Sequence, residues 1–161
     1  VIVQFLERLK SDAFSTPASI PTEQIFIYDV DTKQLIKVEQ NFEGEADPAR
    51  MTVDMKTWYW LKTEYNNDSV HKPRLAKEFG LKFEKNSKVL ITTDCNSMQG
   101  DYRIENKKMQ FNNIISTRMF CADSQEQEFS KMLTSVSSYF FTNKGQLILE
   151  LKYDSGSMTF L

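Results

Sequence analysis

Strand signals fill the chain from residue 55 onward, and one segment among them, 123–139, has the apolar spacing of a helix. Four apolar residues of this segment lie at i, i+3, i+4 and i+7 and form one stripe: Phe129, Met132, Leu133 and Val136. A parallel sheet would need a crossover helix between successive strands. The sequence therefore predicts an α+β, β-rich fold, in which a curled antiparallel sheet or partial barrel packs against one helix.

The strands are predicted from short apolar and aromatic runs that turn residues separate. In 57–65, Trp58 and Trp60 share one face, which we expect to be core. In 147–153, strict alternation predicts that four side chains face one way: Leu147, Leu149, Leu151 and Tyr153. The remaining predicted strands are 81–83, 89–93, 102–104, 109–111, 139–141 and 158–161.

The start of the predicted helix has the residue types of a capping box. Asp123 or Ser124 can serve as the N-cap. Glu126 or Gln127, three residues further on, can bond back to the backbone amide of that cap. We therefore expect the helix to begin with a reciprocal cap made by its own first turn.

Residues 1–52 are predicted to form an extension outside the domain 53–161. Four apolar residues at helical spacing predict a short amphipathic helix over 1–11: Ile2, Phe5, Leu6 and Leu9. The runs 24–30 and 34–39 predict a hairpin. The acidic segment 43–48 contains both Gly and Pro, which makes it the best linker candidate in the chain.

The charge balance argues against nucleic acid as a main partner. The chain has 20 Lys and Arg against 22 Asp and Glu, a formal net charge of −2, whereas phosphate binding needs a basic face. The densest basic stretch is expected to be the solvated rim of a hairpin: Lys82, Lys85 and Lys88. We expect no membrane span, because no apolar run approaches ~18 residues. Val1 is not a start methionine, so we expect any signal peptide or lipid-anchoring cysteine to precede it.

Side chains suited to catalysis or metal binding are few. His71 is the only histidine and lies in a polar stretch, so we interpret it as a solvated loop residue. A nucleophile needs a base beside it, and we therefore expect no enzymatic activity. Asp94 and Asp101 flank a turn, but their spacing matches no calcium loop, and such residues commonly bond their own backbone. The sequence predicts no cofactor and no metal site.

Two motifs that follow the Trp-x-Trp strand carry a family resemblance. The first is Cys-Asn-x-x-x-Gly-x-Tyr at 95–102, and the second is Thr-Arg-Met-x-Cys at 117–121. Together with the helix and two closing strands, they resemble the META (HslJ-like) domain family over 53–161. Many members have Gly in place of Asp94 and an aromatic residue in place of Met98, and neither difference changes the expected fold.

The roles implied for the motif residues are structural. Asn96 is expected to make turn bonds, and Gly100 to hold a backbone position that other residues cannot adopt. Tyr102 and Thr117 belong to the same motifs and are expected to be structural too. Arg118 could anchor an anion or brace its loop by donating its N–H groups, and we favour bracing.

The two cysteines lie one in each motif, and both fall at the ends of predicted elements. A disulfide between Cys95 and Cys121 is therefore predicted, with two buried free thiols as the alternative. Such a bond would indicate an oxidising compartment.

The resemblance implies secreted or envelope-anchored bacterial proteins, some tied to heat shock or antibiotic tolerance, with no agreed molecular activity. We expect a non-enzymatic protein of the cell envelope or secreted fraction. It would support stress tolerance or envelope integrity through contacts with a macromolecule, for which another envelope protein is a candidate. The alternative is a protein that binds a small apolar ligand between the sheet and the helix. A cavity of ~300 Å³ or more with convergent polar groups favours that alternative, whereas an exposed apolar patch over a filled interior favours the partner.

Overall fold

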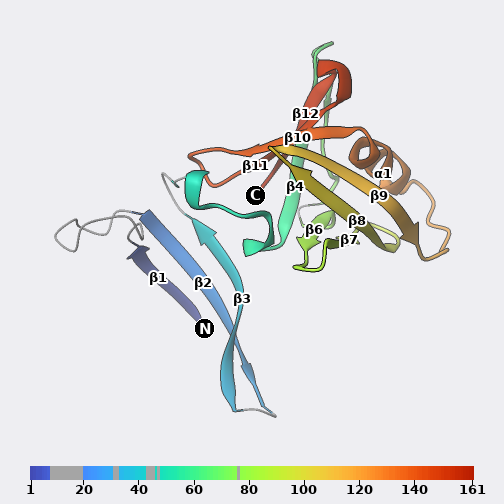
Figure 1. Cartoon of the computed structure of the whole chain (residues 1–161). Helices are drawn as coiled ribbons and strands as arrows, with labels where there is room; N and C mark the ends of the chain where they lie inside the picture. The colour runs from blue at the N-terminus through green and yellow to red at the C-terminus, as the bar shows by residue number, and fades with distance from the viewer. Residues whose placement is uncertain (8–19, 31–32, 43–45, 47, 76) are drawn as a thin grey trace. The chain divides into compact units, whose positions relative to one another are not determined.

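The computed structural model describes residues 1–7, 20–30, 33–42, 46, 48–75 and 77–161 (Figure 1). They divide into two compact units, each with a sheet of its own. The first unit comprises Val1–Lys56 and Phe141–Gln146, and the second comprises Thr57–Phe140 and Leu147–Leu161.

The first unit contains a three-stranded antiparallel sheet in the order β1-β2-β3. Its strands are β1 (Ile2–Glu7), β2 (Ile20–Asp29) and β3 (Gln34–Phe42). The predicted hairpin is present as β2 and β3. Two short 3-10 helices follow in the chain, η1 (Pro48–Arg50) and η2 (Val53–Met55).

The amphipathic helix predicted for 1–11 is wrong wherever the structure describes that segment. Residues 2–7 pair one by one with β2, from Ile2 opposite Ile25 to Glu7 opposite Ile20. Ile2 and Val3 are β-branched and favour an extended backbone, so strand pairing outweighs the helical spacing of the apolar residues. The rest of that prediction, 8–11, lies outside the described residues.

The second unit is built on a nine-stranded sheet, whose order is β12-β11-β10-β9-β8-β7-β6-β4-β5. Because β12 also pairs with β4, the sheet curls round on itself. Its first five strands in the chain are β4 (Trp58–Tyr65), β5 (Val70–His71), β6 (Gly80–Phe83), β7 (Lys88–Thr92) and β8 (Ser97–Glu105). The others are β9 (Lys108–Ser116), β10 (Val136–Phe141), β11 (Leu147–Leu151) and β12 (Gly156–Phe160). The predicted β-rich fold with a curled antiparallel sheet and one packed helix is confirmed.

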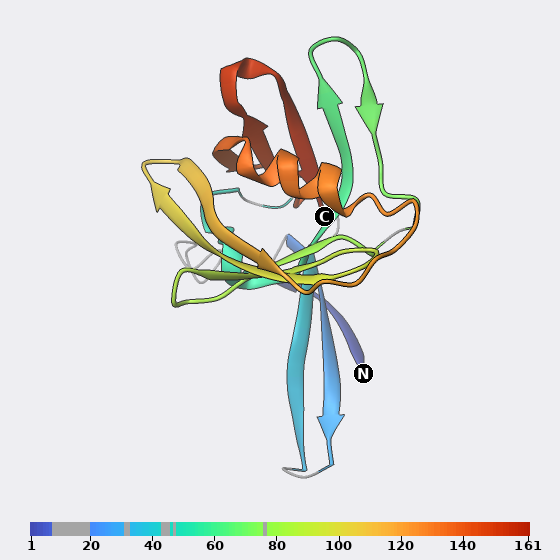
Figure 2. The ribbon, with the colours of Figure 1, turned by 90° about the vertical axis from the view of Figure 1, so that its right-hand side faces the viewer.

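The helix α1 (Glu126–Thr134) lies over the part of the sheet formed by β6 to β9 (Figure 2). Three residues of the predicted stripe are buried in it: Phe129, Met132 and Leu133. Val136 is buried as well, but it begins β10, so the helix is shorter than predicted. No helix in the described part of the chain is long and apolar enough to cross a membrane.

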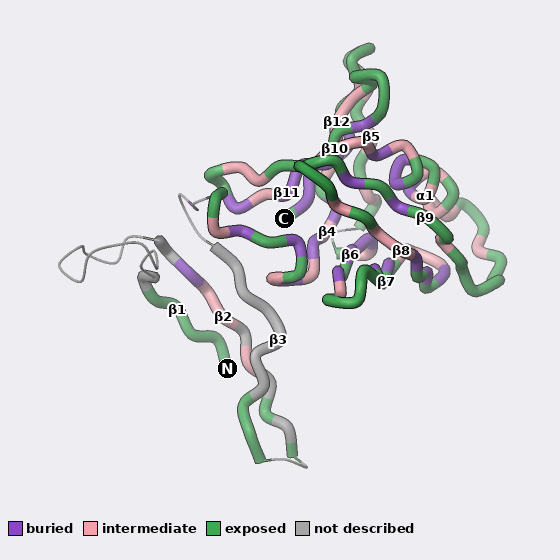
Figure 3. The backbone as a smooth tube through the Cα atoms, viewed as in Figure 1, coloured by how far each residue is buried: buried purple, intermediate pink, exposed green. Residues whose placement is uncertain are grey.

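Aromatic rings join the helix to the sheet in the core of the second unit. The Phe129 ring centroid lies 4.9 Å from that of Phe79 and 5.3 Å from that of Trp60. Trp58 and Trp60 are both fully buried, as their shared face predicts. Buried residues, drawn purple in Figure 3, recur along the strands and the helix of the second unit.

The alternation predicted for 147–153 stops before its last residue. Leu147, Leu149 and Leu151 are buried, but Tyr153 is 98% exposed. Tyr153 lies in the 3-10 helix η3 (Lys152–Asp154) and has a positive φ of 61°. The chain therefore turns one residue after β11, and the Tyr153 side chain points to solvent.

Candidate functional site

The two cysteines form a disulfide that joins the connections at one end of β7, β8 and β9. Cys95 lies between β7 and β8, and Cys121 lies between β9 and α1, with their Cα atoms 5.8 Å apart. By the chain-entropy model, a bond that closes a loop of this length stabilises the fold by about 3–4 kcal/mol. It holds the segment after β9 close to the start of β8.

Asn96, beside the disulfide, is buried and is the centre of a hydrogen-bond network. Its side chain Oδ1 accepts bonds from Thr117 Oγ1 at 2.7 Å and from the Met119 peptide nitrogen at 2.9 Å. Its Nδ2 donates to the Met119 carbonyl at 3.1 Å and to Glu126 Oε1 at 3.2 Å. Asn96 is only 6% exposed, and every polar atom of its side chain is used. It therefore holds three segments together and has no capacity left for a ligand.

The helix begins differently from the predicted capping box. Its N-cap is Gln125, whose peptide nitrogen donates to Asp94 Oδ2 at 2.8 Å. Asp94 Oδ1 accepts a bond from Ser124 Oγ at 2.6 Å, and Ser124 Oγ accepts the Glu126 peptide N–H at 3.0 Å. The Glu126 carboxylate bonds to Asn96 instead of turning back to the cap. A carboxylate about thirty residues away thus supplies the favourable negative charge at the helix start.

Gly100 and Tyr102 have structural roles of different kinds. A Cβ built on Gly100 would lie 3.0 Å from Ile114 Cγ1 and 3.1 Å from the Asn112 carbonyl oxygen. Close approach of β9, and not a positive φ, therefore explains the glycine. The Tyr102 hydroxyl donates to the Glu84 carbonyl at 2.9 Å, and its ring meets Phe83 edge-on at 5.0 Å.

The segment after β9 presents exposed side chains. Arg118 is exposed, and among the described residues its guanidinium has no hydrogen bond or ion pair, so the bracing role favoured for it stays a prediction. The next two residues are apolar, and their exposed fractions are 62% for Met119 and 94% for Phe120. Because Met119 is bonded to Asn96 through both backbone groups, this apolar segment is held in place.

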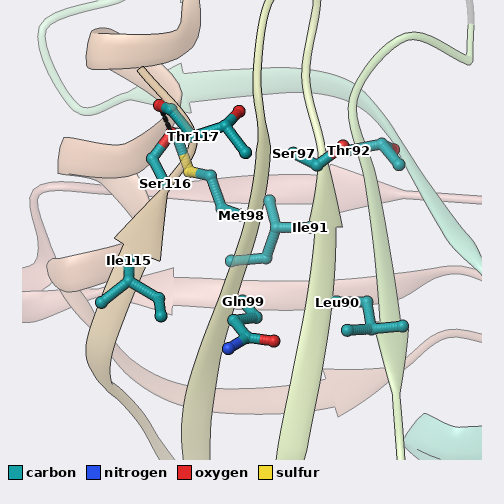
Figure 4. A pocket seen from close by; sticks show the side chains of 9 residues that line it. All are labelled: Leu90, Ile91, Thr92, Ser97, Met98, Gln99, Ile115, Ser116 and Thr117. Atoms are coloured by element: carbon teal, nitrogen blue, oxygen red, sulfur yellow. Dashed lines mark hydrogen bonds between the residues drawn. The ribbon is translucent and has the colours of Figure 1, made fainter.

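An open groove of about 470 Å³ lies along the ends of β7, β8 and β9, next to this network (Figure 4). Its nine lining residues come from these three strands and the residue after β9: Leu90, Ile91, Thr92, Ser97, Met98, Gln99, Ile115, Ser116 and Thr117. In the strand register, Leu90 lies opposite Gln99, and Gln99 lies opposite Ile115. These three form a row on the solvent side of the sheet, with Ile115 59% exposed. We call this surface the β9 face.

The strand β9 is paired on only one side over most of its length. It pairs with β8 from Lys108 to Asn112 and again at Ile115 and Ser116, but with β10 only where Lys108 meets Ser138. The register of β8 and β9 shifts between Gln99 and Asp101, and Asn113 has a positive φ of 51° at this bulge. Within the described residues, the far side of β9 beyond Met109 pairs with no strand.

The residues considered for catalysis and metal binding do not come together. Asp94 caps α1, whereas Asp101 forms an ion pair with Lys88 at 2.5 Å. The Lys88 ammonium, with help from Asn113, holds the pKa of Asp101 below its ordinary value against a smaller opposing effect of burial. In the described ranges, no cluster of His, Cys, Asp and Glu could hold a metal ion.

The sequence interpretation missed a polar contact of His71. His71 lies on β5, and its Nδ1 pairs with the Glu128 carboxylate of α1, while its ring meets Tyr65 edge-on at 5.3 Å. Burial and the Glu128 charge raise the pKa of Tyr65. No local pattern points to this contact, because β5 and α1 are far apart in the sequence.

The META domain family model matches residues 53–161. Among solved structures, a protein from Burkholderia xenovorans is similar, with 18% identity, a TM-score of 0.59, and coverage of 73% of this chain and 88% of that chain. A DUF4847 family protein from Bacteroides vulgatus is 11% identical with a TM-score of 0.54, over 67% of this chain and 92% of that one. No curated protein matches the chain. The two solved structures support the fold alone.

Proposed function

The chain belongs to the META domain family, and on that premise we propose that it is a non-enzymatic binding module of the cell envelope or the secreted fraction. In this proposal it supports stress tolerance or envelope integrity by binding another protein through the β9 face. The observation that carries the proposal is the open groove of about 470 Å³ on that face. Its lining combines apolar side chains with hydroxyl and amide groups, the mixture that fits a protein surface or peptide.

The disulfide supports the assignment to an oxidising compartment. Disulfides persist in oxidising compartments and are rare where thiol reductants are abundant. Cys95 and Cys121 are bonded to each other in the same region that positions the β9 face. The stress role is carried by the family resemblance alone.

The state of the potentially reactive side chains supports a non-enzymatic role. The His71 ring is paired with Glu128, and neither cysteine has a free thiol to act as a nucleophile. Nucleophilic catalysis needs such a group within hydrogen-bond distance of a base. The residues that line the groove include no histidine, cysteine or charged side chain.

Binding of a small apolar ligand is the second candidate. The groove volume falls in the range of small-molecule sites, but the groove lies on the solvent side of the sheet. A smaller pocket of about 310 Å³ lies between α1 and the sheet, and charged Glu128 and Lys131 help to line it. Neither site encloses an apolar ligand, so a protein partner is the better fit.

Site-specific photo-crosslinking in the cells that produce the protein tests the proposal. The crosslinking residue p-benzoylphenylalanine replaces Ile115 in one variant and the highly exposed Tyr153 in a matched control. We expect a discrete, protease-sensitive adduct from position 115 that the control does not give. A small protease-resistant adduct would instead support the ligand candidate, and no adduct specific to position 115 would contradict both.

A further inference from the structure

The open side of β9 exposes backbone groups that can bind another strand. The Tyr102 peptide N–H points away from β9 and donates to the Ser87 carbonyl oxygen at 2.9 Å. Phe111 lies opposite Tyr102, and two opposite residues of an antiparallel pair either bond to each other or both direct their peptide groups outward, so Phe111 directs its own peptide groups away from β8. Beyond the bulge, the Thr117 peptide N–H donates to the Ser97 carbonyl oxygen of β8 at 3.2 Å. Because adjacent residues of an antiparallel strand alternate in direction, Ile114 and Ser116 direct their peptide groups to the open side.

This edge lacks the usual charged protection against pairing. Natural sheets guard exposed edges with charged side chains, proline, bulges or very short strands. The nine residues from Met109 to Thr117 contain no charged residue and no proline. The bulge at Asn113 is the single protective feature along them, and it leaves three residues in regular register with β8 afterwards.

The edge and the groove are adjacent. Ile115 and Thr117 line the groove. They alternate along the chain with Ile114 and Ser116, whose peptide groups point to the open side. A strand added to β9 would continue the sheet, and its alternate side chains would lie on the solvent side beside Ile115. One segment could therefore use both features, with main-chain bonds at the edge and side chains at the groove.

We propose that the occupant of the β9 face is an extended peptide segment of the partner protein, which adds to the open edge of β9 between Phe111 and Ser116. The segment carries apolar residues at alternate positions, and these contact Ile115 and the groove. This inference rests on the proposed function and specifies its partner chemistry.

The test measures peptide binding before and after one backbone N–H, that of Ser116, is removed. A displayed library of random nine-residue peptides is selected against the full chain, and synthetic copies of the selected peptides are titrated by fluorescence anisotropy. Ser116→Pro removes an outward N–H that β8 does not use, a position where proline is compatible with a strand. Ser116→Ala keeps the N–H and is the matched control. We expect binding at least about tenfold weaker in S116P and within about twofold in S116A.

Amide hydrogen exchange on the unmodified chain keeps the test valid if S116P does not fold. A bound peptide should slow exchange at the outward amides of Phe111, Ile114 and Ser116. It should leave Gln110 and Asn112 unchanged, because their register places their amides toward β8. Equal slowing at both sets, or at neither, would overturn the inference.

The other outcomes separate this inference from the proposed function. If Ile115→Asp weakens peptide binding but S116P does not, the groove is the binding site and edge pairing is wrong. If no peptide is selected, edge pairing is wrong, and the crosslinking experiment still decides the proposed function. If the chain self-associates and S116P abolishes this, the occupant is a second copy, and the inference of a partner peptide is overturned.

Discussion

The Asn96 peptide nitrogen lies 2.8 Å from Glu126 Oε2, while the Asn96 side-chain nitrogen lies 3.2 Å from Glu126 Oε1. One carboxylate in the first turn of α1 therefore accepts bonds from two N–H groups of a residue thirty positions earlier. Hydrogen bonds to an ionised group are stronger than those between neutral groups. This pairing, together with the adjacent disulfide, fixes the end of the sheet that carries the β9 face.

Asn96→Ala should destabilise the second unit by about 2–4 kcal/mol. Asn96 is itself only 6% exposed, and the substitution removes its bonds to the Glu126 carboxylate, Thr117 Oγ1 and the Met119 peptide groups. Urea unfolding measures the loss. Asn112→Ala is the control, because Asn112 is exposed and should change stability by less than about 0.5 kcal/mol. Equal effects of the two substitutions would mean that the network does not stabilise the fold.

Gly100→Ala should destabilise by about 1–3 kcal/mol. The new methyl group would press on the Asn112 carbonyl oxygen at 3.1 Å, and backbone atoms yield less readily than side chains. Gln99→Ala, on the exposed side of the same strand, is the control. Thermal unfolding at neutral pH is sufficient. An unchanged melting temperature in G100A would show that β9 moves aside without cost.

The core of the second unit was predictable because its signals are local. The apolar stripe of α1 and the shared face of Trp58 and Trp60 both follow from the period of one element. The end of the helix was not predictable in the same way. Val136 continues the stripe, but it begins a strand that lies between β11 and β9, and a pairing between distant segments decides its conformation.

The candidate site depends on contacts that one sequence does not encode locally. Asp94 caps a helix that begins far along the chain, and His71 meets Glu128 across two elements. The open edge of β9 likewise depends on where β10 leaves the sheet, which a strand pattern does not specify. The motif residues were found from the resemblance, but their bonds required the folded arrangement.

Leu133→Ala should cost about 2–5 kcal/mol, because Leu133 is fully buried on the inner face of α1 and the substitution leaves a cavity. Lys131→Ala, on the exposed side of the same helix, should cost less than about 0.5 kcal/mol. Chemical denaturation of both variants gives the difference. A small loss in L133A would mean that the stripe does not face the core.

Asp101 should contribute to stability in a pH-dependent way. Lys88 and Asn113 lower the pKa of Asp101 in the folded chain below its ordinary value of 3.8. The stabilisation is therefore fully present above the unfolded-state pKa and is lost as the pH falls through the folded-state pKa. The difference in unfolding free energy between the wild type and Asp101→Asn should be constant from pH 7 to about 5 and shrink below about pH 4. A difference that grows on acidification would contradict this assignment.

The bond between Cys95 and Cys121 holds the β9 face in place and supports the assignment to an oxidising compartment. Measuring whether this bond is present in the native protein is therefore the most direct test of both. The measurement is mass spectrometry of protein isolated from its producing cells and alkylated under denaturing conditions, with and without prior reduction. We predict no alkylation before reduction and uptake of two alkyl groups after it. Uptake of two groups without reduction would show free thiols. The covalent tether of the β9 face and the envelope assignment would then both be wrong.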